Sequence, residues 1–353
     1  MKKTKKLMVE HCTVYPAAAP LDIFKYIYQS SFGCEHMVTD LDRVTLMIEE
    51  EYKAMERGIV RDVEELDGKF CRIPLSILDT GISADTFGKL FFLSAKDKGE
   101  GREAFFEKLE AARELAKEGK FPFDAESFER ALFEWETKGY PAVHHSDAFR
   151  NEYRPAYRVI SKKYFPFIKL FAEIDRRLEK GSVIVALEGG SASGKTTLAK
   201  TLSKIYDCNV FHMDDFFLQM HQRTPERFKE VGGNVDRERF IEEILEPLKR
   251  GEQVRYRKFD CSKMILGDYI EPKNKKLTVV EGAYSMHPDM GSAYDISVFL
   301  SISGEEQKAR INKRNTPETA KRFFNEWIPL EEKYFSKMGI KEKCSMVIYT
   351  DKN

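Results

Sequence analysis

The sequence predicts an α/β protein in which a parallel β-sheet flanked by helices is preceded by a mainly helical N-terminal domain. Three observations support this prediction. The length of 353 residues exceeds the usual size of one compact domain. Up to about residue 180, apolar residues recur at helical spacing. From Val183 onward, short apolar runs alternate with helix-like stretches, which is the pattern of a parallel sheet. We therefore predict two domains, residues 1–180 and 181–353, with the boundary near Gly181 and Ser182.

Helical spacing dominates the first domain. Apolar residues three and four positions apart predict helices over residues 21–31, 41–57, 102–119, 127–135 and 163–179. The third of these stretches ends with Lys117 and Gly119, which are typical of a helix C-terminus. A segment of this length is sufficient for a hydrophobic core of its own.

The second domain alternates strands with helices. Its first strand is predicted at residues 183–187, where five consecutive apolar residues indicate a strand buried on both faces. Further strands are predicted at 208–213, 277–280, 296–302 and 346–349, and helices at 196–205, 237–250, 305–314 and 317–337.

A glycine-rich segment directly follows the first strand and satisfies the pattern G-x-x-x-x-G-K-S/T. Glycines let successive backbone N–H groups point at phosphate oxygens, at a helix N-terminus whose dipole favours anions. Lys195 would reach the β- and γ-phosphates, and the Thr196 hydroxyl would ligate Mg²⁺. The alternative is a chance glycine-rich turn with a surface lysine. The strand before it and the helix after it favour a P-loop NTPase-type sheet, with nucleotide bound by Gly189, Gly190, Ser191, Ala192, Ser193, Gly194, Lys195, Thr196 and Thr197.

Acidic residues follow two of the other predicted strands. Asp214 and Asp215 end the second strand, beside the nucleotide loop, where ligands bind in open α/β sheets. One of these acids could accept the proton of an attacking hydroxyl and help order Mg²⁺, or the pair could cap a helix. Glu281 ends the third strand, on the expected metal side of the triphosphate, although a strand-end glutamate can also be merely solvated.

A basic segment follows the fourth strand on two predicted helices, and its cations are Lys308, Arg310, Lys313, Arg314, Lys321 and Arg322. A cationic flap that closes over a transferring phosphoryl group would exclude water and neutralise developing charge. A solvated helix face would have the same composition.

These four motifs, residues 189–197, 213–217, 280–284 and the Arg310/Arg314 stretch, together resemble the uridine kinase-like P-loop kinases. Nicotinamide riboside kinases, bacterial pantothenate kinases and phosphoribulokinases are relatives of that group. The resemblance covers roughly residues 182 to 350 and implies phosphorylation, with ATP and Mg²⁺, of a hydroxyl on a small molecule. It implies Asp214 as the base, Lys195 and Thr196 as phosphate and magnesium residues, Asp214 and Glu281 as further metal residues, and Arg310 and Arg314 as the lid.

The acceptor is less well defined by the resemblance. Uridine kinases have a Tyr-Asp pair followed by a histidine that contacts the pyrimidine, whereas here Phe259 is followed by Met264 where that histidine is expected. Because hydrogen bonds to a base edge provide strong discrimination, uridine itself is not the predicted acceptor. Candidate acceptor-binding residues, which could equally be surface residues, are Asp215, Phe259, Tyr256 and Arg223.

The first domain resembles the N-terminal extension of some bacterial uridine kinase-like proteins, whose role the resemblance does not define. Two polar clusters, residues 34–36 and 144–147, contain histidine and acidic side chains. Neither matches a metal or hydrolase motif, so helix caps and surface hydrogen bonds are the favoured interpretation. Tyr153, Tyr157, Arg154 and Arg158 recur at i, i+4, which predicts one helix with an aromatic and a cationic face. That helix could dock onto the kinase domain or hold a phosphorylated ligand.

Charge and cysteine content restrict the partners. Lys+Arg and Asp+Glu both number 58, so the formal net charge is +0 and no nucleic-acid partner is expected. No run of about 18 apolar residues predicts a membrane span. The six scattered cysteines contain no CxxC pair and suggest reduced thiols and a cytoplasmic location. The expected partner is a small-molecule acceptor, and homo-oligomerisation and a preference for ATP or GTP stay open.

A second function is compatible with the nucleotide loop. The chain could be a nucleotide-binding or ATPase switch whose second domain regulates the helical first domain. The acid pair at 214–215 and the basic lid favour the kinase, because a switch needs neither an acceptor base nor a flap that closes over a substrate.

Overall fold

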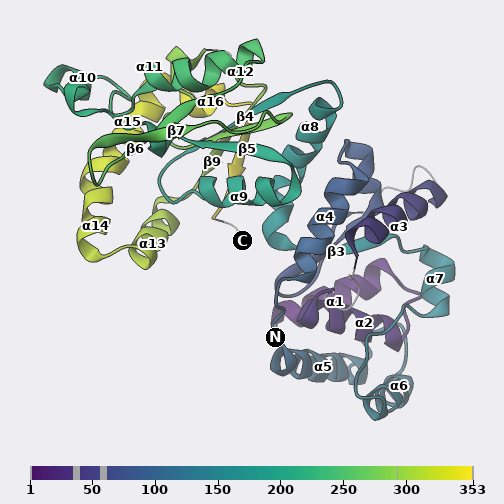
Figure 1. Cartoon of the computed structure of the whole chain (residues 1–353). Coiled ribbons are helices and arrows are strands. Elements are labelled where there is room, and N and C mark those ends of the chain that lie inside the picture. The colour runs from purple at the N-terminus through teal and green to yellow at the C-terminus, as the bar shows by residue number, and fades with distance from the viewer. Residues whose placement is uncertain (1, 35–39, 56–61, 292, 352–353) are drawn as a thin grey trace. The chain divides into compact units, whose positions relative to one another are not determined.

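The computed structural model describes residues 2–34, 40–55, 62–291 and 293–351 (Figure 1). The chain divides into two compact units, Met1–Ala172 and Glu173–Asn353. This division lies within helix α8 (Ile168–Leu178), whereas the boundary predicted from the sequence lies after that helix. Of the polar cluster at residues 34–36, Glu35 and His36 lie outside the described residues, as do residues 56 and 57 of the helix predicted at 41–57.

The N-terminal unit is mainly helical, as predicted, and also contains a small antiparallel sheet that was not predicted. Its helices are α1 (Lys2–Val14), α2 (Pro20–Phe32), α3 (Leu41–Ala54), α4 (Ala84–Ala95), α5 (Arg102–Lys117), α6 (Ala125–Thr137) and α7 (Asp147–Tyr153), with 3₁₀ turns η2 (Leu75–Thr80) and η3 (Lys162–Phe167). The sheet has the order β1-β2-β3, formed by β1 (Glu64–Glu65), β2 (Phe70–Pro74) and β3 (Tyr157–Ser161).

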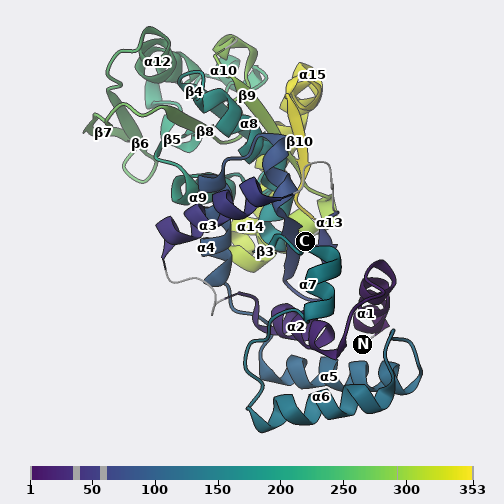
Figure 2. The ribbon, with the colours of Figure 1, turned by 90° about the vertical axis from the view of Figure 1, so that its right-hand side faces the viewer.

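Aromatic side chains fill the core of this unit. The ring of Phe24 on α2 stacks on Trp135 of α6 at 4.7 Å and meets Phe128 edge-on at 5.3 Å. Helices α5 and α6 lie side by side in both views (Figures 1 and 2). Ser146 of the second polar cluster caps α7, because its Oγ accepts a hydrogen bond from the Phe149 amide. That contact agrees with the helix-cap interpretation, but the prediction of surface hydrogen bonds is wrong for His145 of this cluster, which is buried.

The helix predicted across Tyr153 and Tyr157 is wrong. Helix α7 ends at Tyr153, and β3 begins at Tyr157. Arg154 has a positive φ of 41°, and it precedes Pro155, which disfavours a helical conformation at the preceding residue. Tyr157 and Arg158 therefore point to opposite faces of a strand instead of sharing helix faces with Tyr153 and Arg154.

The C-terminal unit contains a five-stranded parallel sheet with the order β10-β9-β4-β8-β5. Its strands are β4 (Val183–Gly189), β5 (Cys208–His212), β8 (Leu277–Glu281), β9 (Ile296–Ser301) and β10 (Met346–Tyr349). All five were predicted within two residues of these bounds. Together with the glycine-rich loop after β4, this sheet confirms the predicted P-loop NTPase-type fold.

Helices cover both faces of this sheet, so its strands are apolar on both sides. The helices of this unit after β4 are α9 (Lys195–Ile205), α10 (Pro225–Lys229), α11 (Arg237–Phe240), α12 (Glu246–Arg250), α13 (Gly304–Arg314), α14 (Pro317–Arg322), α15 (Ile328–Met338) and α16 (Ile340–Lys343). Helix α9 lies on one face, and α11 and α12 lie on the other (Figure 1). The helices predicted at 237–250 and 317–337 each contain a π-helical turn, at Ile241–Leu245 and Phe323–Trp327.

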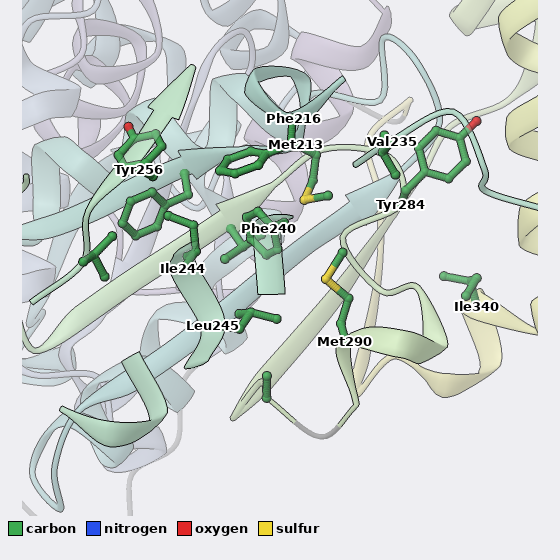
Figure 3. Packing of buried hydrophobic residues seen from close by; sticks show 14 of the residues in the cluster. Met213, Phe216, Val235, Phe240, Ile244, Leu245, Tyr256, Tyr284, Met290 and Ile340 are labelled. Carbon is green, nitrogen blue, oxygen red and sulfur yellow. The ribbon is translucent and has the colours of Figure 1, made fainter. Parts of the chain in front are cut away.

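A large hydrophobic cluster anchors the segments that follow the strands. It includes Met213 and Phe216, directly after β5, packed with Phe240 of α11 (Figure 3). The 3₁₀ turns of this unit are η4 (Met213–Phe216), η5 (Met220–Gln222) and η7 (Pro288–Met290). An antiparallel hairpin that was not predicted, β6 (Tyr256–Asp260) and β7 (Ile265–Ile270), packs against η4. The carboxyl ends of β4, β5 and β8 thus meet at one supported edge, where ligands bind in such sheets.

Two findings concern the whole described chain. No described helix has the length and apolar character needed to cross a bilayer. All six cysteines are free thiols in the structure.

Candidate active site

The glycine-rich loop curls tightly between β4 and α9. Gly189 has a φ of 141°, and a Cβ at this position would lie 2.5 Å from the carbonyl oxygen of Leu300. Gly194 has a φ of 100° and ends the loop at the N-terminus of α9. The positive φ therefore favours glycine at both positions. At Gly189 a side chain would also clash with the backbone of Leu300.

Replacing Gly189 with alanine is expected to destabilise the C-terminal unit by about 2–3 kcal/mol, through backbone strain and the clash with Leu300. Chemical unfolding of the full chain measures this change. The matched control is Gly194→Ala, which shares the positive φ but has no atom within 4 Å of the added Cβ. Equal losses of stability in the two variants would contradict the role of the close approach at Gly189.

Lys195 and Thr196 start helix α9 and contact the elements around the loop. The Lys195 ammonium donates hydrogen bonds to the carbonyl oxygens of Gly189 and Gly190 at 2.7 and 2.9 Å, so it lies across the loop. The Thr196 hydroxyl donates to Oε1 of Glu281 at 3.1 Å. The lysine, the hydroxyl and the strand-end glutamate of β8 are thus brought together, as the sequence predicted for a phosphate and magnesium site.

His212 belongs to the same group and was not assigned a role from the sequence. Its Nδ1 lies 2.6 Å from Oε1 of Glu281, and the two residues are paired in register on β5 and β8. The hydrogen bond to Glu281 raises the pKa of His212, against the opposing effect of burial. Its position directly before the motif at residues 213–217 was the only signal in the sequence.

The two aspartates after β5 have different surroundings. Asp214 is solvent-accessible, yet desolvation by the surrounding protein raises the pKa of its carboxyl, and the negative charge of Glu281 raises it further. The positive charge of Lys195 acts in the opposite direction, so this carboxylate lies within electrostatic reach of the loop. Asp215 instead forms an ion pair with Lys258 of β6 at 2.9 Å.

Two further glutamates form hydrogen bonds with the loop, and neither was predicted from the sequence. Glu188, the last residue before Gly189, accepts hydrogen bonds from the backbone N–H of Gly189 and Met286 and from the hydroxyl of Tyr334. Burial raises its pKa to about 7. A glutamate inside an apolar strand could have signalled this role.

Glu331 on α15 binds the loop from far along the chain. Its carboxylate accepts a hydrogen bond from the Ser191 amide at 2.8 Å and another from the Ser191 hydroxyl at 2.7 Å. Burial raises the pKa of Glu331. Gln307 of α13 donates to the Ser191 carbonyl oxygen at 2.8 Å. The backbone N–H and the carbonyl oxygen of Ser191 are therefore both hydrogen-bonded to side chains from distant parts of the sequence. Nothing in the local sequence pattern indicated these partners.

The basic segment contributes one arginine to the loop. Arg310 of α13 donates through Nη1 to the carbonyl oxygen of Ala192 at 3.3 Å and through Nη2 to that of Thr350 at 2.6 Å. The Thr350 hydroxyl in turn donates to the Ser193 carbonyl oxygen at 2.9 Å. Arg314, the other predicted lid arginine, stacks over the ring of Phe323 at 5.3 Å. The structure thus brings Arg310, and not Arg314, to the loop among the contacts of the described residues.

The structure brings only some of the predicted acceptor-binding residues close to one another. The guanidinium of Arg223 lies 5.9 Å from the ring centre of Phe259, a residue of β6. The ring of Tyr256 packs in the hydrophobic cluster, edge-on to Phe211 at 5.3 Å (Figure 3). Met264 has a φ of 58° in the turn of the β6–β7 hairpin. Arg223 therefore lies beside Phe259, and Asp215 is paired with Lys258, whereas the acceptor-binding role of all four predicted residues stays a prediction.

The oxygen atoms at the edge suit a magnesium nucleotide in their chemistry. Among residues 2–34, 40–55, 62–291 and 293–351, no group of three or more histidine, cysteine, aspartate or glutamate side chains forms a ready metal site. Mg²⁺ in nucleotide sites usually takes one or two carboxylates, with waters and phosphate oxygens as its other ligands. The Thr196 hydroxyl and the carboxylates of Asp214 and Glu281 are donors of that type.

No family model matches the chain. A solved structure described as a possible uridine kinase from Bacillus stearothermophilus is 20% identical, and the match covers 51% of this chain and 99% of that chain with a TM-score of 0.38. One described as a candidate fructose transport system kinase from a Silicibacter species is 22% identical over 47% and 89% of the two chains, with a TM-score of 0.38.

A shikimate kinase from Bacteroides thetaiotaomicron is 15% identical over 47% and 84%, with a TM-score of 0.23. All three structures are described as kinases, and each match covers about half of this chain. At these identities the likeness concerns the fold alone. The assignment of the fold therefore depends on the strand order and glycine-rich loop of this chain.

Proposed function

We propose that the C-terminal unit transfers the γ-phosphoryl group of ATP, in the presence of Mg²⁺, to a hydroxyl of a small molecule. The observation that carries this proposal is the grouping at the sheet edge. The charges of Lys195 in the loop and of Glu281 both act on the Asp214 carboxylate. Glu281 also accepts a hydrogen bond from the Thr196 hydroxyl. A base, a phosphate cation and magnesium-type donors are the groups that phosphoryl transfer to an alcohol needs.

The loop and the residues around it would bind the triphosphate. Backbone N–H groups of the loop and the N-terminus of α9 would face the phosphate oxygens. Lys195 would exchange its two carbonyl partners for β- and γ-phosphate oxygens. Thr196, Asp214 and Glu281 would hold Mg²⁺, which when bound neutralises charge on the phosphates. Arg310, adjacent to Ala192 of the loop, would add a further positive charge.

The chemical step would need Asp214 as a proton acceptor. The acceptor oxygen forms a bond to the γ-phosphorus, and the bond from that phosphorus to the oxygen bridging to the β-phosphate breaks. The hydroxyl proton moves to the Asp214 carboxylate, and ADP leaves with the electron pair of the broken bond. The raised pKa of Asp214 makes its carboxylate a stronger base than an ordinary aspartate.

We infer that the acceptor is nucleoside-like or a related polar metabolite. Phe259 could stack on a ring, Arg223 lies beside that ring, and the Asp215–Lys258 pair could hydrogen-bond hydroxyl groups. The chain has Met264 where a pyrimidine-contacting histidine would be expected, which favours acceptors other than uridine.

An acceptor screen tests the proposal. Purified full-length protein with ATP and Mg²⁺ is incubated with a panel of nucleosides, ribosides and vitamins, and ADP formation is measured. At least one acceptor should increase ADP formation in proportion to the acceptor added, with one phosphorylated product per ADP.

The Lys195→Ala variant is the control, because it removes the cation that would contact the phosphates. ADP formation that is unaffected by every acceptor, but lost in Lys195→Ala, would favour the ATPase switch. ADP formation that survives Lys195→Ala would assign the activity to a contaminant.

A further inference from the structure

A buried polar network in the N-terminal unit takes no part in the proposed phosphoryl transfer. At its centre is Arg72 of β2, whose side chain is 2% exposed. Its Nε donates to Oε1 of Gln29 at 2.8 Å, and its Nη1 donates to the Glu64 carboxylate at 3.0 and 3.2 Å. Its Nη2 is buried and has no hydrogen-bond partner among the described residues. Leaving a buried guanidinium N–H without an acceptor costs free energy of folding.

A hydrogen-bonded chain of three side chains fixes the surroundings of Arg72. The Asp22 carboxylate accepts a hydrogen bond from Nδ1 of His145 at 2.7 Å. The other ring nitrogen of His145, Nε2, lies 2.7 Å from the Tyr157 hydroxyl oxygen. Burial lowers the pKa of His145 to about 4, so the ring is neutral and its Nε2 accepts the hydroxyl hydrogen. The ring of Tyr157 is thereby held 4.9 Å from the Arg72 guanidinium carbon.

A second cation lies close to this network. Asp22, Lys25, Tyr26 and Gln29 are three and four residues apart on α2, so they share the helix face that contacts Arg72 and His145. The Lys25 ammonium donates to the Val143 carbonyl oxygen at 3.1 Å, and no carboxylate of the described residues forms an ion pair with it. Burial lowers the pKa of Lys25 to about 8, and the charge of Arg72 contributes to the decrease.

The carboxylates nearby are already engaged. Glu64 accepts from Arg72 and from Nδ1 of His11, and Asp22 accepts from His145 and Ser146. Nη2 of Arg72 is therefore without an acceptor among the described residues. The Lys25 ammonium has a neutral carbonyl oxygen as its hydrogen-bond acceptor, and no described carboxylate neutralises its charge. A network that only stabilised the fold would explain the paired groups, but neither the unpartnered Nη2 of Arg72 nor the charge of Lys25 that no carboxylate neutralises.

We propose that Arg72 and Lys25 form a binding site for a small oxyanion, a carboxylate or a phosphate group, in the N-terminal unit. Guanidinium and ammonium groups are the donors that bind such anions most strongly in proteins. The His145–Tyr157 pair acts as a positioning element, because it holds the aromatic ring against which the guanidinium lies. The site is independent of the proposed kinase activity.

Thermal unfolding of the full-length Lys195→Ala protein tests this proposal, since that background lacks the loop lysine that would also contact phosphate. Inorganic phosphate and succinate are titrated separately. At least one should raise Tm saturably, by roughly 5 °C at about 100 times its Kd. A response to phosphate alone identifies a phosphate site, and a response to succinate alone identifies a carboxylate site. Adding Lys25→Met should abolish the shift.

The matched control is Lys117→Met, which removes an exposed lysine of α5 in the same unit and should keep the shift. Arg72 itself is left intact, because it holds Glu64. A second measurement needs no substitution at the site: acylation of Lys25 at pH 8, followed by mass spectrometry, should be slowed by the effective probe. The proposal is overturned if neither probe gives a saturable shift, if the shift survives Lys25→Met, or if the acylation of Lys25 is unchanged.

Discussion

Replacing Asp214 with asparagine is expected to lower turnover by about 10²-fold or more while nucleotide binding survives, because an amide cannot accept the proton of the attacking hydroxyl. The carboxylate lies within electrostatic reach of Lys195, and its pKa is raised by desolvation and by the charge of Glu281. Turnover of the unchanged protein should therefore fall as the pH is lowered through this raised pKa, where the base becomes protonated. Steady-state kinetics with an acceptor from the screen, together with a nucleotide titration, measures both effects.

The matched control is Asp215→Asn, one residue further along. Asp215 is paired with Lys258 of β6, so this substitution should act mainly on the KM for the acceptor. If Asp214→Asn kept normal turnover while Asp215→Asn lost it, the base would be Asp215. Normal turnover in both variants would remove the proposed acid-base step altogether.

Replacing Glu64 with glutamine is expected to destabilise the N-terminal unit by roughly 3 kcal/mol, because it leaves the buried charge of Arg72 without its carboxylate. The value is placed at the lower end of the range for buried pairs since the Glu64 side chain is 19% exposed. Urea unfolding of the full chain measures it. The adjacent Glu65 is a matched control: it is 48% exposed and pairs with Lys3 and Lys162, so Glu65→Gln should cost less than about 1 kcal/mol.

The same pair makes the unit sensitive to acid. Burial alone would raise the pKa of Glu64, but the charge of Arg72 and the hydrogen bond from His11 outweigh it and lower the pKa to about 2. Because this folded-state pKa lies below the ordinary value of 4.5, the stabilisation is complete above pH 4.5 and is lost as the pH falls toward 2. Glu64→Gln should lack this part of the pH dependence. A wild-type unit that keeps its stability over that window would contradict the pairing.

The parts of the fold that local patterns determine could be predicted from the sequence. The parallel strands show as short apolar runs, because strands covered on both faces have no polar side. The loop at Gly189 to Thr196 was recognisable because its glycines, lysine and hydroxyl are consecutive along the chain. The strand-end acids Asp214 and Glu281 could be placed together because parallel strands end at the same edge.

Contacts between residues distant in the sequence could not be predicted in this way. Glu331 binds Ser191 across 140 positions, and Arg72 meets Gln29 across 43. Neither pair leaves a periodic signal, since each depends on how separate elements pack. The helix predicted through Tyr157 is wrong for a different reason: Pro155 disfavours a helical conformation at Arg154, although Tyr and Arg recur there at helical spacing.

The junction of Arg310 and Thr350 with the glycine-rich loop has a consequence for the outermost strand of the sheet. Arg310 donates hydrogen bonds to the carbonyl oxygens of Ala192 and of Thr350, just beyond β10, and the Thr350 hydroxyl donates one to the carbonyl oxygen of Ser193. A displacement of that strand would be transmitted directly to the peptide groups of the loop that we propose to bind the nucleotide. The last strand therefore supports the glycine-rich loop, and the rigidity of the loop depends on a segment that lies more than a hundred residues downstream of it.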